Sequence, residues 1–398
     1  MTKLRVRGLT KVFGSQPRRA LELMEQGYQR PEILERTGQL LAVADVDLDI
    51  DEGELFVIMG LSGSGKSTVI RMLNRLIEPT AGTIELDGEY IDALSPAGLR
   101  RMRQQKMSMV FQHFALFPHR TVGENAAYGL KVQGVGEDER RARAIEALET
   151  VGLGDRVDAY PHEMSGGMQQ RVGLARGLAT EADILLMDEP FSALDPLIRR
   201  DMQDLLAELQ SGLDRTIVFI THDLNEAMRL GDRICVLKDG RVVQVGTGPE
   251  IIDNPANQYV EDFVSDVDRS RVLTAEQVMR APRRTYRPSD SPREVLEWLD
   301  EQEFNGVYVL DDQERILGVA RDDRLVKGIR DGVTRVGDLV IEDYASAGPD
   351  TLLSDLAAIA AHHTVPIPVL DREGRLLGVV PRARLLGALS NEEVPANA

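Results

Sequence analysis

Hydrophobic and polar positions follow two different patterns along the first 270 residues. Residues 1–14 alternate apolar and polar side chains, and the alternation resumes from Leu41 to Ile50, which predicts two strands with one buried face each. Continuous apolar runs are typical of strands buried on both faces. They cover residues 56–59, 184–189, 216–221 and 233–238. Helical segments separate these runs, so the pattern predicts an α/β fold with a mostly parallel sheet covered on both faces.

Three further segments complete the prediction for this part of the chain. Residues 16–39 are polar and interrupt the two alternating strands as a helical insertion. Residues 83–91 predict a hairpin around Asp87-Gly88, a dipeptide that suits a tight turn. Apolar residues at helical spacing within 137–151 predict a helical subdomain.

The pattern changes near residue 270, where a repeat begins. The segment 307–329 recurs as 367–389 at a constant offset of 60 residues. The matching pairs are Val309/Val369, Leu310/Leu370, Asp311/Asp371, Arg315/Arg375, Gly318/Gly378, Val319/Val379 and Leu325/Leu385. So many matches in register indicate two copies of one structural unit. We interpret residues 274–390 as two βαββα units packed on each other, followed by a loose tail over 391–398.

A glycine-rich loop joins the apolar run at 56–59 to a helix. It reads GLSGSGKS from Gly60 to Ser67, which fits the pattern G-x-x-x-x-G-K-[ST]. Such a turn lets backbone N–H groups approach a phosphate closely, and the following helix N-terminus adds partial positive charge. Lys66 is expected to reach the β- and γ-phosphates of a nucleotide, and the Ser67 hydroxyl to bind Mg²⁺.

Two carboxylates end a later strand. Asp188 and Glu189 follow the apolar residues 184–187, so both are expected near the phosphates at the carboxyl edge of the sheet. Asp188 is the predicted Mg²⁺ ligand, and Glu189 is predicted to polarise the attacking water.

A second anion site is predicted at Ser165-Gly166-Gly167, which opens a helix rich in Ala and Leu. The N-terminal amides of that helix and the Ser165 hydroxyl are suitable donors to a phosphate. Because this site cannot fold back onto its own phosphate loop, it suits the γ-phosphate of a nucleotide bound by another copy of the chain.

Composition narrows the class of protein. A length of 398 residues is enough for two or three domains. The net charge of −18 argues against nucleic acid as a partner, because phosphate binding needs a basic face. The single cysteine, Cys235, allows no disulfide framework and indicates a reducing compartment. We expect no signal segment at the start of the chain and no membrane span within it.

Together these residues resemble the nucleotide-binding domain of ABC transporters, over residue 4 to about residue 265. Gln112, in MVFQHFALFP, is similar to the Q-loop glutamine, which touches Mg²⁺ or water and faces the membrane partner. MSGGM at 164–168 resembles the signature sequence, with methionine where the family has leucine and glutamine at the two ends. His222 resembles the switch histidine near the γ-phosphate.

The resemblance also implies the remaining site residues, with ATP and Mg²⁺ as cofactors. Residues 192–195 are similar to the D-loop, and Phe13 lies where the family places an aromatic ring that stacks on adenine. The implied catalytic residues are Glu189, His222 and Gln112, and the implied Mg²⁺ ligands are Ser67, Gln112 and Asp188. The implied nucleotide-binding residues are Phe13, Gly60, Ser62, Gly63, Ser64, Gly65, Lys66, Ser67, Thr68, Ser165, Gly166, Gly167 and Asp195.

A narrower resemblance comes from the insertion and from the runs IMGLSGSGKSTVIRMLNRLIEPT, FALFPHRTV and SGGMQQRVGLARGLA. They look like the ATPase subunit of glycine betaine/proline betaine importers, which ends in a pair of CBS domains. This implies a P-loop ABC ATPase domain over 1–268, with a RecA-like core, a helical subdomain and an antiparallel β part. It also implies CBS domains at 274–332 and 333–390, with the tail at 391–398.

The function that this resemblance implies is ATP-driven import of betaine-type osmolytes, regulated by the CBS pair in response to osmotic or ionic conditions. The implied partners are a second copy of the chain in an ATP sandwich, permease subunits in the membrane and, through them, a periplasmic or extracellular solute-binding protein. The implied location is the cytoplasmic face of the cell (inner) membrane, as a peripheral subunit. Import of choline or another amine stays open, and a soluble regulatory ABC ATPase is the alternative from a different class.

The C-terminal repeat departs from the nucleotide-binding CBS pattern G-[IV]-x-[TS]-x-x-D. After Gly318 and Gly378 the aspartate that would bind ribose is replaced by Arg324 and Arg384. Two interpretations stay open. The arginines contribute to a cationic face that docks on an anionic surface and is screened by salt, or the repeat is a dimerisation module with solvated arginines.

Overall fold

The computed structural model describes residues 1–112, 115–192, 194–212, 215–265 and 268–390. The chain divides into two compact units, Met1–Asp266 and Val267–Ala398. We describe each unit by itself. No helix in the described ranges is both long enough and apolar enough to cross a membrane. The predicted loose tail lies outside the described residues.

The first sheet of the N-terminal unit is antiparallel, with strand order β2-β1-β4-β5. Its strands are β1 (Thr2–Phe13), β2 (Leu40–Asp51), β4 (Ala81–Leu86) and β5 (Glu89–Tyr90). The two alternating segments of the sequence form β1 and β2, which pair along nearly their whole length. Asp87 and Gly88, with φ of 51° and 82°, make the turn from β4 to β5.

The second sheet has six strands in the order β10-β9-β3-β8-β7-β6. They are β3 (Leu55–Met59), β6 (Met107–Val110), β7 (Ile184–Asp188), β8 (Thr216–Thr221), β9 (Arg233–Lys238) and β10 (Arg241–Gly246). All neighbouring pairs are parallel except β9 with β10. The four apolar runs of the sequence form β3, β7, β8 and β9, whereas the edge strands β6 and β10 were not predicted.

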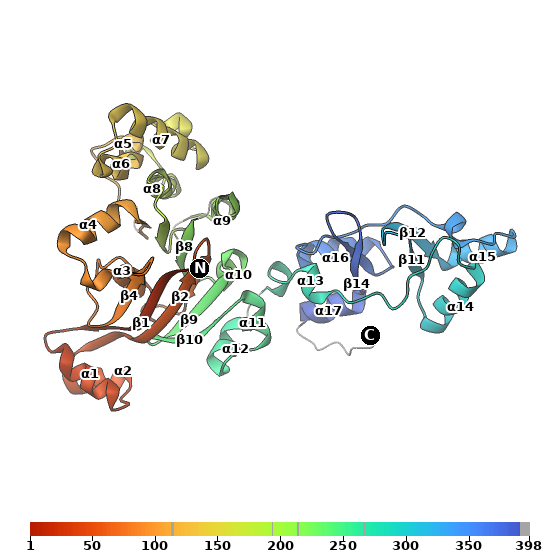
Figure 1. Cartoon of the computed structure of the whole chain (residues 1–398), viewed down its shortest axis with the longest axis horizontal. Coiled ribbons are helices and arrows are strands. Elements are labelled where there is room, and N and C mark those ends of the chain that lie inside the picture. The colour runs from red at the N-terminus through yellow and green to blue at the C-terminus, as the bar shows by residue number, and fades with distance from the viewer. Residues whose placement is uncertain (113–114, 193, 213–214, 266–267, 391–398) are drawn as a thin grey trace. The chain divides into compact units, whose positions relative to one another are not determined.

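Helices connect and cover these sheets (Figure 1). They are α3 (Lys66–Leu73), α4 (Pro96–Gln105), α5 (Val122–Ala126), α6 (Tyr128–Gln133), α7 (Glu137–Thr150), α8 (Gly166–Ala179), α9 (Pro196–Gly212), α10 (Leu224–Leu230), α11 (Gly248–Asp253) and α12 (Gln258–Val264). Short 3-10 turns lie at Ile91–Ala93, Gly154–Arg156 and Pro161–Glu163. One apolar core joins residues of both sheets to α3, including Val43, Ile58, Val69 and Ile220, which are all fully buried. This core fixes α3, and with it the phosphate loop, between the sheets.

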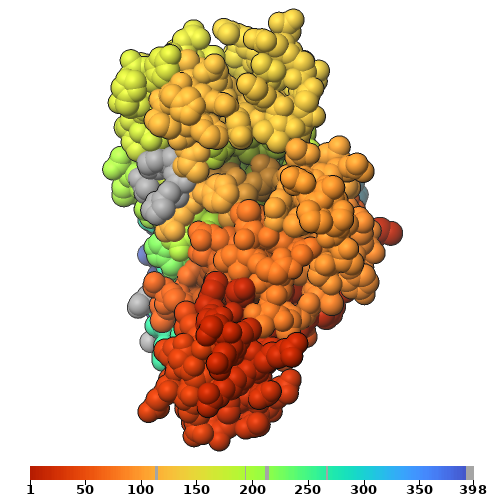
Figure 2. Space-filling model, turned by 90° about the vertical axis from the view of Figure 1, so that its left-hand side faces the viewer, coloured from red at the N-terminus to blue at the C-terminus, as the bar shows by residue number. Residues whose placement is uncertain are grey.

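The helical subdomain and the insertion lie at opposite ends of the N-terminal unit. Figure 2 shows the subdomain, which contains α5 to α7, in yellow at the top and the insertion in red at the bottom. The insertion consists of two short helices, α1 (Pro17–Glu25) and α2 (Arg30–Thr37). The predicted helical character of both regions is therefore confirmed.

The C-terminal unit contains two hairpins with the same layout. The first repeat has α14 (Pro292–Gln302), β11 (Gly306–Leu310), β12 (Ile316–Arg321) and α15 (Asp322–Arg330). The second has α16 (Leu353–His362), β13 (Ile367–Leu370), β14 (Leu376–Val380) and α17 (Arg382–Ser390). The remaining elements are α13 (Ala275–Val278) and 3-10 turns at Arg269–Arg271 and Val336–Leu339. The first strand of each predicted βαββα unit is reduced to a single bridge, Tyr286 with Val309 and Ala347 with Val369.

The two repeats also exchange short segments. Arg280, which follows α13, pairs with Val379 of the second repeat, and Ile341 pairs with Val319 of the first. Correspondingly, Val278 belongs to the core of the second repeat and Val336 to that of the first. A third cluster, of Tyr308, Leu310, Val319 and Val379, joins the repeats to each other.

Candidate nucleotide site

The phosphate loop lies between β3 and α3, and its glycines are required by the close approach of other backbone segments. Gly60 has a φ of +150°, and a Cβ there would lie 2.2 Å from the carbonyl oxygen of Leu237. Gly65 has a φ of +104°, and its Cβ would lie 2.6 Å from the carbonyl oxygen of Ala42. No L-amino acid with a side chain fits either position without movement of the backbone.

Lys66 is buried at the start of α3, with only 5% of the residue exposed. Its ammonium group donates hydrogen bonds to the carbonyl oxygens of Gly60, at 2.8 Å, and Leu61, at 3.1 Å. Burial lowers the pKa of Lys66, against the opposing influence of Glu189 and Asp188. The cation therefore lies inside its own loop, bonded to two backbone carbonyl groups.

Asp188, at the end of β7, is fully buried and has two partners on α3. The Ser67 hydroxyl donates to one carboxylate oxygen at 2.8 Å, and Arg71 bonds the other at 3.0 Å. The sequence reasoning did not identify Arg71. Helical spacing was the available signal, since residues four apart, such as Ser67 and Arg71, lie on the same face of a helix.

The Glu189 carboxylate contacts two of the other predicted residues, Gln112 and His222. One of its carboxylate oxygens lies 3.1 Å from the side-chain amide nitrogen of Gln112 and 3.2 Å from Nδ1 of His222. The residue has a φ of +47°, which is unusual for a side chain other than glycine. Such strained backbone concentrates at functional sites. The Glu189 backbone N–H donates to the Ile220 carbonyl at 3.1 Å, which ties this strained turn to β8.

The residues present fit a magnesium ion. Ser67 and Asp188 offer oxygen atoms only 2.8 Å apart, beside the phosphate loop. Mg²⁺ prefers such a set of few protein oxygens, completed by phosphate and water. The Gln112 side-chain amide donates a hydrogen bond to Glu189, the residue that directly follows Asp188. Among the described residues no group of three or more His, Cys, Asp or Glu is arranged to bind a metal.

Ser165, Gly166 and Gly167 lie apart from this cluster. Ser165 is the N-cap of α8, and its hydroxyl accepts from the Met168 N–H at 3.4 Å. Ser165 and Gly166 are exposed. The prediction that this helix end binds the γ-phosphate of another copy stays a prediction.

The other predicted residues are Phe13, Asp195 and the remaining residues of the phosphate loop. Phe13 ends β1 with 39% of its surface exposed, and the Lys11 ammonium lies 5.1 Å from the centre of its ring. Asp195 is exposed just before α9. In the loop, Ser62 and Gly63 are exposed, Ser64 is buried with no hydrogen-bond partner for its hydroxyl, and the Thr68 N–H donates to Gly65 at 3.0 Å. Ala193 of the predicted D-loop lies outside the described residues.

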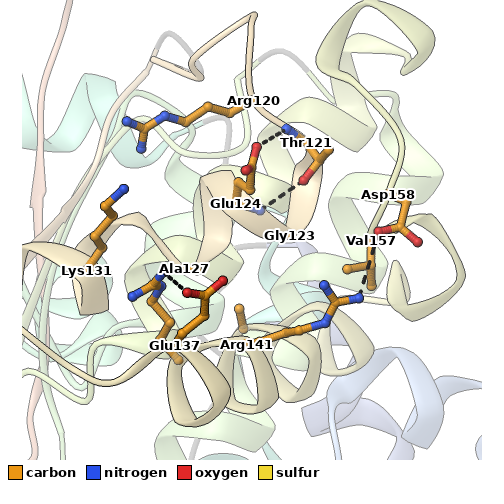
Figure 3. Close-up of a pocket in the computed structure, with 12 residues that line it drawn as sticks. Arg120, Thr121, Gly123, Glu124, Ala127, Lys131, Glu137, Arg141, Val157 and Asp158 are labelled. Atoms are coloured by element: carbon orange, nitrogen blue, oxygen red, sulfur yellow. Dashed lines mark hydrogen bonds and ion pairs between the residues drawn. The ribbon is translucent and has the colours of Figure 1, made fainter.

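A cavity of about 220 Å³ opens in the helical subdomain (Figure 3). Its lining is mostly charged, with Arg120, Lys131 and Arg141 beside Glu137 and Asp158. A second cavity, of about 270 Å³, is more apolar. It is lined by Leu76, Met109, Phe111, Tyr128 and Val132, among others. Phe111, which lines this second cavity, directly precedes Gln112, whose side chain contacts Glu189.

The fold and this cluster define a P-loop ATPase of the ATP-binding cassette class. The family model described as ABC transporter matches residues 43–192, and the CBS domain model matches 336–391. The dimeric structure of the cassette MJ0796 in a post-hydrolysis state with ADP and phosphate is similar, with a TM-score of 0.54 and 34% identity. The match covers 62% of this chain and 98% of that one. This class binds nucleotides and couples ATP hydrolysis to transport.

Two curated relatives extend the likeness over the whole chain. The glycine betaine transport ATP-binding protein OpuAA of Bacillus subtilis is 47% identical over 396 residues, covering 100% of this chain and 94% of the relative. The glycine betaine/proline betaine ATP-binding protein ProV of Escherichia coli is 47% identical over 397 residues, covering 98% of each. The chain therefore belongs to the family of ABC transporter ATP-binding subunits that contains these two proteins.

Proposed function

We propose that this chain is the ATP-hydrolysing subunit of an importer for glycine betaine, proline betaine or a closely related osmolyte. Full-length identity of 47% to subunits of such systems supports the solute class. The convergence of Gln112 and His222 on Glu189, next to the pair Ser67–Asp188, is the observation that carries the enzymatic part. These side chains come from four separate segments, and their proximity supports a role in nucleotide hydrolysis.

Each residue has a role that follows from its position. Lys66 exchanges its two carbonyl partners for the β- and γ-phosphates of ATP, and the loop amides from Gly60 to Thr68 bind the remaining phosphate oxygens. Ser67, Asp188 and Gln112 would hold Mg²⁺, which neutralises the charge that develops on the phosphates. Phe13 stacks on the adenine.

Glu189 accepts a hydrogen bond from the attacking water and orients it toward the γ-phosphate. His222 and Gln112 both contact the same carboxylate oxygen of Glu189, whose backbone N–H donates to the Ile220 carbonyl, so the three side chains are held close together for this step. The exposed N-terminus of α8 and Asp195 complete the site on a second copy, whose nucleotide lies between the two chains.

Two cavities support a docking place for the permease, one in the helical subdomain and one where α6 and α8 meet β6 and α4. A cytoplasmic helix of a membrane subunit would place its apolar residues in the cavity at Phe111 and Tyr128 and its charged residues against Arg120 and Glu137. The chain would then lie at the cytoplasmic face of the membrane as a peripheral subunit, and a solute-binding protein would act through the permease. We further propose that residues 1–268 are the ATPase domain and that 274–332 and 333–390 are CBS domains that regulate transport with osmotic or ionic conditions.

The test is uptake of radiolabelled glycine betaine by vesicles that contain this subunit and its permease, with ATP and stepped salt inside. We expect Glu189→Gln to lower hydrolysis and uptake at least about 100-fold, the usual contribution of a general base. Glu89→Gln, on the exposed strand β5, is the matched control and should retain both activities. Hydrolysis without betaine uptake would contradict the solute and favour choline or another amine. Uptake that does not depend on internal salt would contradict regulation by the CBS pair.

A further inference from the structure

The insertion between β1 and β2 is a firmly packed helical hairpin. Ala20 of α1 and Ile33 of α2 are fully buried against Val12, Leu41 and Ala44 of the two strands. Figure 1 shows the pair as a red projection beyond the strands. A polar surface element that served only as a connection would not need this apolar contact, so its orientation on the unit is fixed.

The hairpin presents one side chain to the phosphate loop. Arg30 is the first residue of α2, and the Gln29 N–H before it is bonded to the Glu32 carboxylate at 2.9 Å in a capping box. The backbone of Arg30 is therefore held in place by the cap. From there its guanidinium donates a hydrogen bond of 2.9 Å to the carbonyl oxygen of Gly63.

Beside the Arg30 contact the loop is exposed, although the Leu61 carbonyl also accepts from Lys66 at 3.1 Å and from the Ser64 N–H at 3.1 Å. Leu61, Ser62 and Gly63 are exposed. Gly63 has a φ of +79°, and no atom lies within 4 Å of the position that a Cβ would take. By contrast, the carbonyl of the next residue, Ser64, accepts from the Gly240 N–H at 2.9 Å and is buried in the core side of the loop.

We propose that Arg30 is a positioning residue for the nucleotide site, which holds the exposed half of the phosphate loop in its phosphate-binding conformation. With the Gly63 carbonyl directed to the guanidinium, the loop amides stay available to phosphate oxygens. A loop ordered before the nucleotide arrives loses less conformational entropy on binding. The guanidinium also adds a fixed positive charge at the rim of an anion site. The insertion thus contributes a residue to the proposed ATP site.

The inference rests on the proposed function, because it assumes that the loop binds ATP. The test is a titration of the full-length subunit with a fluorescent ATP analogue and with ADP, followed by ATPase kinetics of the assembled transporter. We expect Arg30→Gln to raise Kd for both nucleotides and KM for ATP by about three- to tenfold, as for loss of a partly solvated, charge-assisted hydrogen bond. Because Arg30 contacts neither Glu189 nor His222, kcat should change less than twofold. Arg30→Lys should restore part of the affinity.

The matched control is Arg19→Gln, which removes the same charge from an exposed position on α1. It should bind nucleotide like the wild type and should unfold at the same temperature as Arg30→Gln. An Arg30→Gln variant with wild-type affinity would overturn this inference alone. A wild type that binds no ATP would overturn the proposed function as well. A kcat that falls in parallel with affinity would also overturn the inference, because it would indicate a role in the chemical step.

Discussion

The two units of this chain place their charged residues in opposite ways. In the N-terminal unit, Lys66 and Asp188 are almost completely buried, and every buried polar or charged side chain among the described residues lies between Thr10 and Glu226. In the C-terminal unit the buried side chains are apolar or tyrosine, and Arg324 is exposed. Burying a charge costs free energy unless it is paired. The first unit therefore accepts this cost at the phosphate loop and at Glu54 and Glu226, whereas the described part of the second unit buries no charged side chain.

The largest effect should come from removing the buried cation. Lys66→Ala deletes the group that we propose contacts the β- and γ-phosphates, and we expect kcat/KM for ATP to fall at least about 100-fold, as for loss of a preorganised donor to developing charge. Urea unfolding followed by the fluorescence of Trp298, the single tryptophan of the chain, should show the same transition in this variant as in the wild type, because Trp298 lies in the C-terminal unit. A shift of the Trp298 transition would contradict the separation of the two units.

A smaller effect is expected in the C-terminal unit, where the repeat provides its own matched pair. Val309 and Val369 are equivalent and fully buried. Truncation of either to alanine should cost about 2 kcal/mol of unfolding free energy, from lost apolar area and a small cavity. ATP affinity should be unchanged. The measurement is urea unfolding followed by Trp298.

This pair also tests whether the repeats unfold together. Trp298 lies in the first repeat, packed between Tyr286 and Phe304. Because Tyr308 and Val379 belong to one cluster that joins the repeats, we expect Val369→Ala to shift the Trp298 transition as much as Val309→Ala does. If only Val309→Ala shifts it, the repeats unfold independently.

The same contrast explains what could be predicted from the sequence. Buried strands and the glycine-rich motif are local patterns, so the positions of Lys66, Ser67 and Asp188 at one sheet edge followed from them. The repeat revealed two equivalent units through its constant offset. The reduced first strand of each repeat and the exchanged pairs Arg280–Val379 and Val319–Ile341 were missed, because they depend on how two similar units pack.

Contacts between segments that lie far apart in the sequence were also hard to predict, because no local pattern indicates them. Arg71 could have been found by its helical spacing from Ser67. The bond from Arg30 to Gly63 could not, since nothing in a polar insertion indicates which part of the fold it will contact. The edge strands β6 and β10 were also missed, because their short segments show neither a clear apolar run nor a clear alternation.

The smallest effect concerns Glu226 on α10, a buried carboxyl in the N-terminal unit outside the phosphate cluster. Gln203 donates a hydrogen bond of 2.8 Å to it. Burial raises the pKa of Glu226, against the opposing hydrogen bonds from Thr221 and Gln203. The pKa of Glu226 is raised in the folded state above its ordinary value of 4.5. The protonated carboxyl therefore contributes its full stabilisation below about pH 4.5, and this contribution is lost as the pH rises through the pKa of the folded protein.

Glu226→Gln keeps a neutral polar group at this position at every pH. We therefore expect it to unfold like the wild type at pH 4 and to be more stable at pH 8, by up to about 1 kcal/mol or 2–4 °C in Tm. Scanning calorimetry of the full chain measures this, with the exposed Glu89→Gln as control. Equal stability of variant and wild type at both pH values would mean that Glu226 is charged at little cost, and that burial of charge in this unit is not confined to the phosphate cluster.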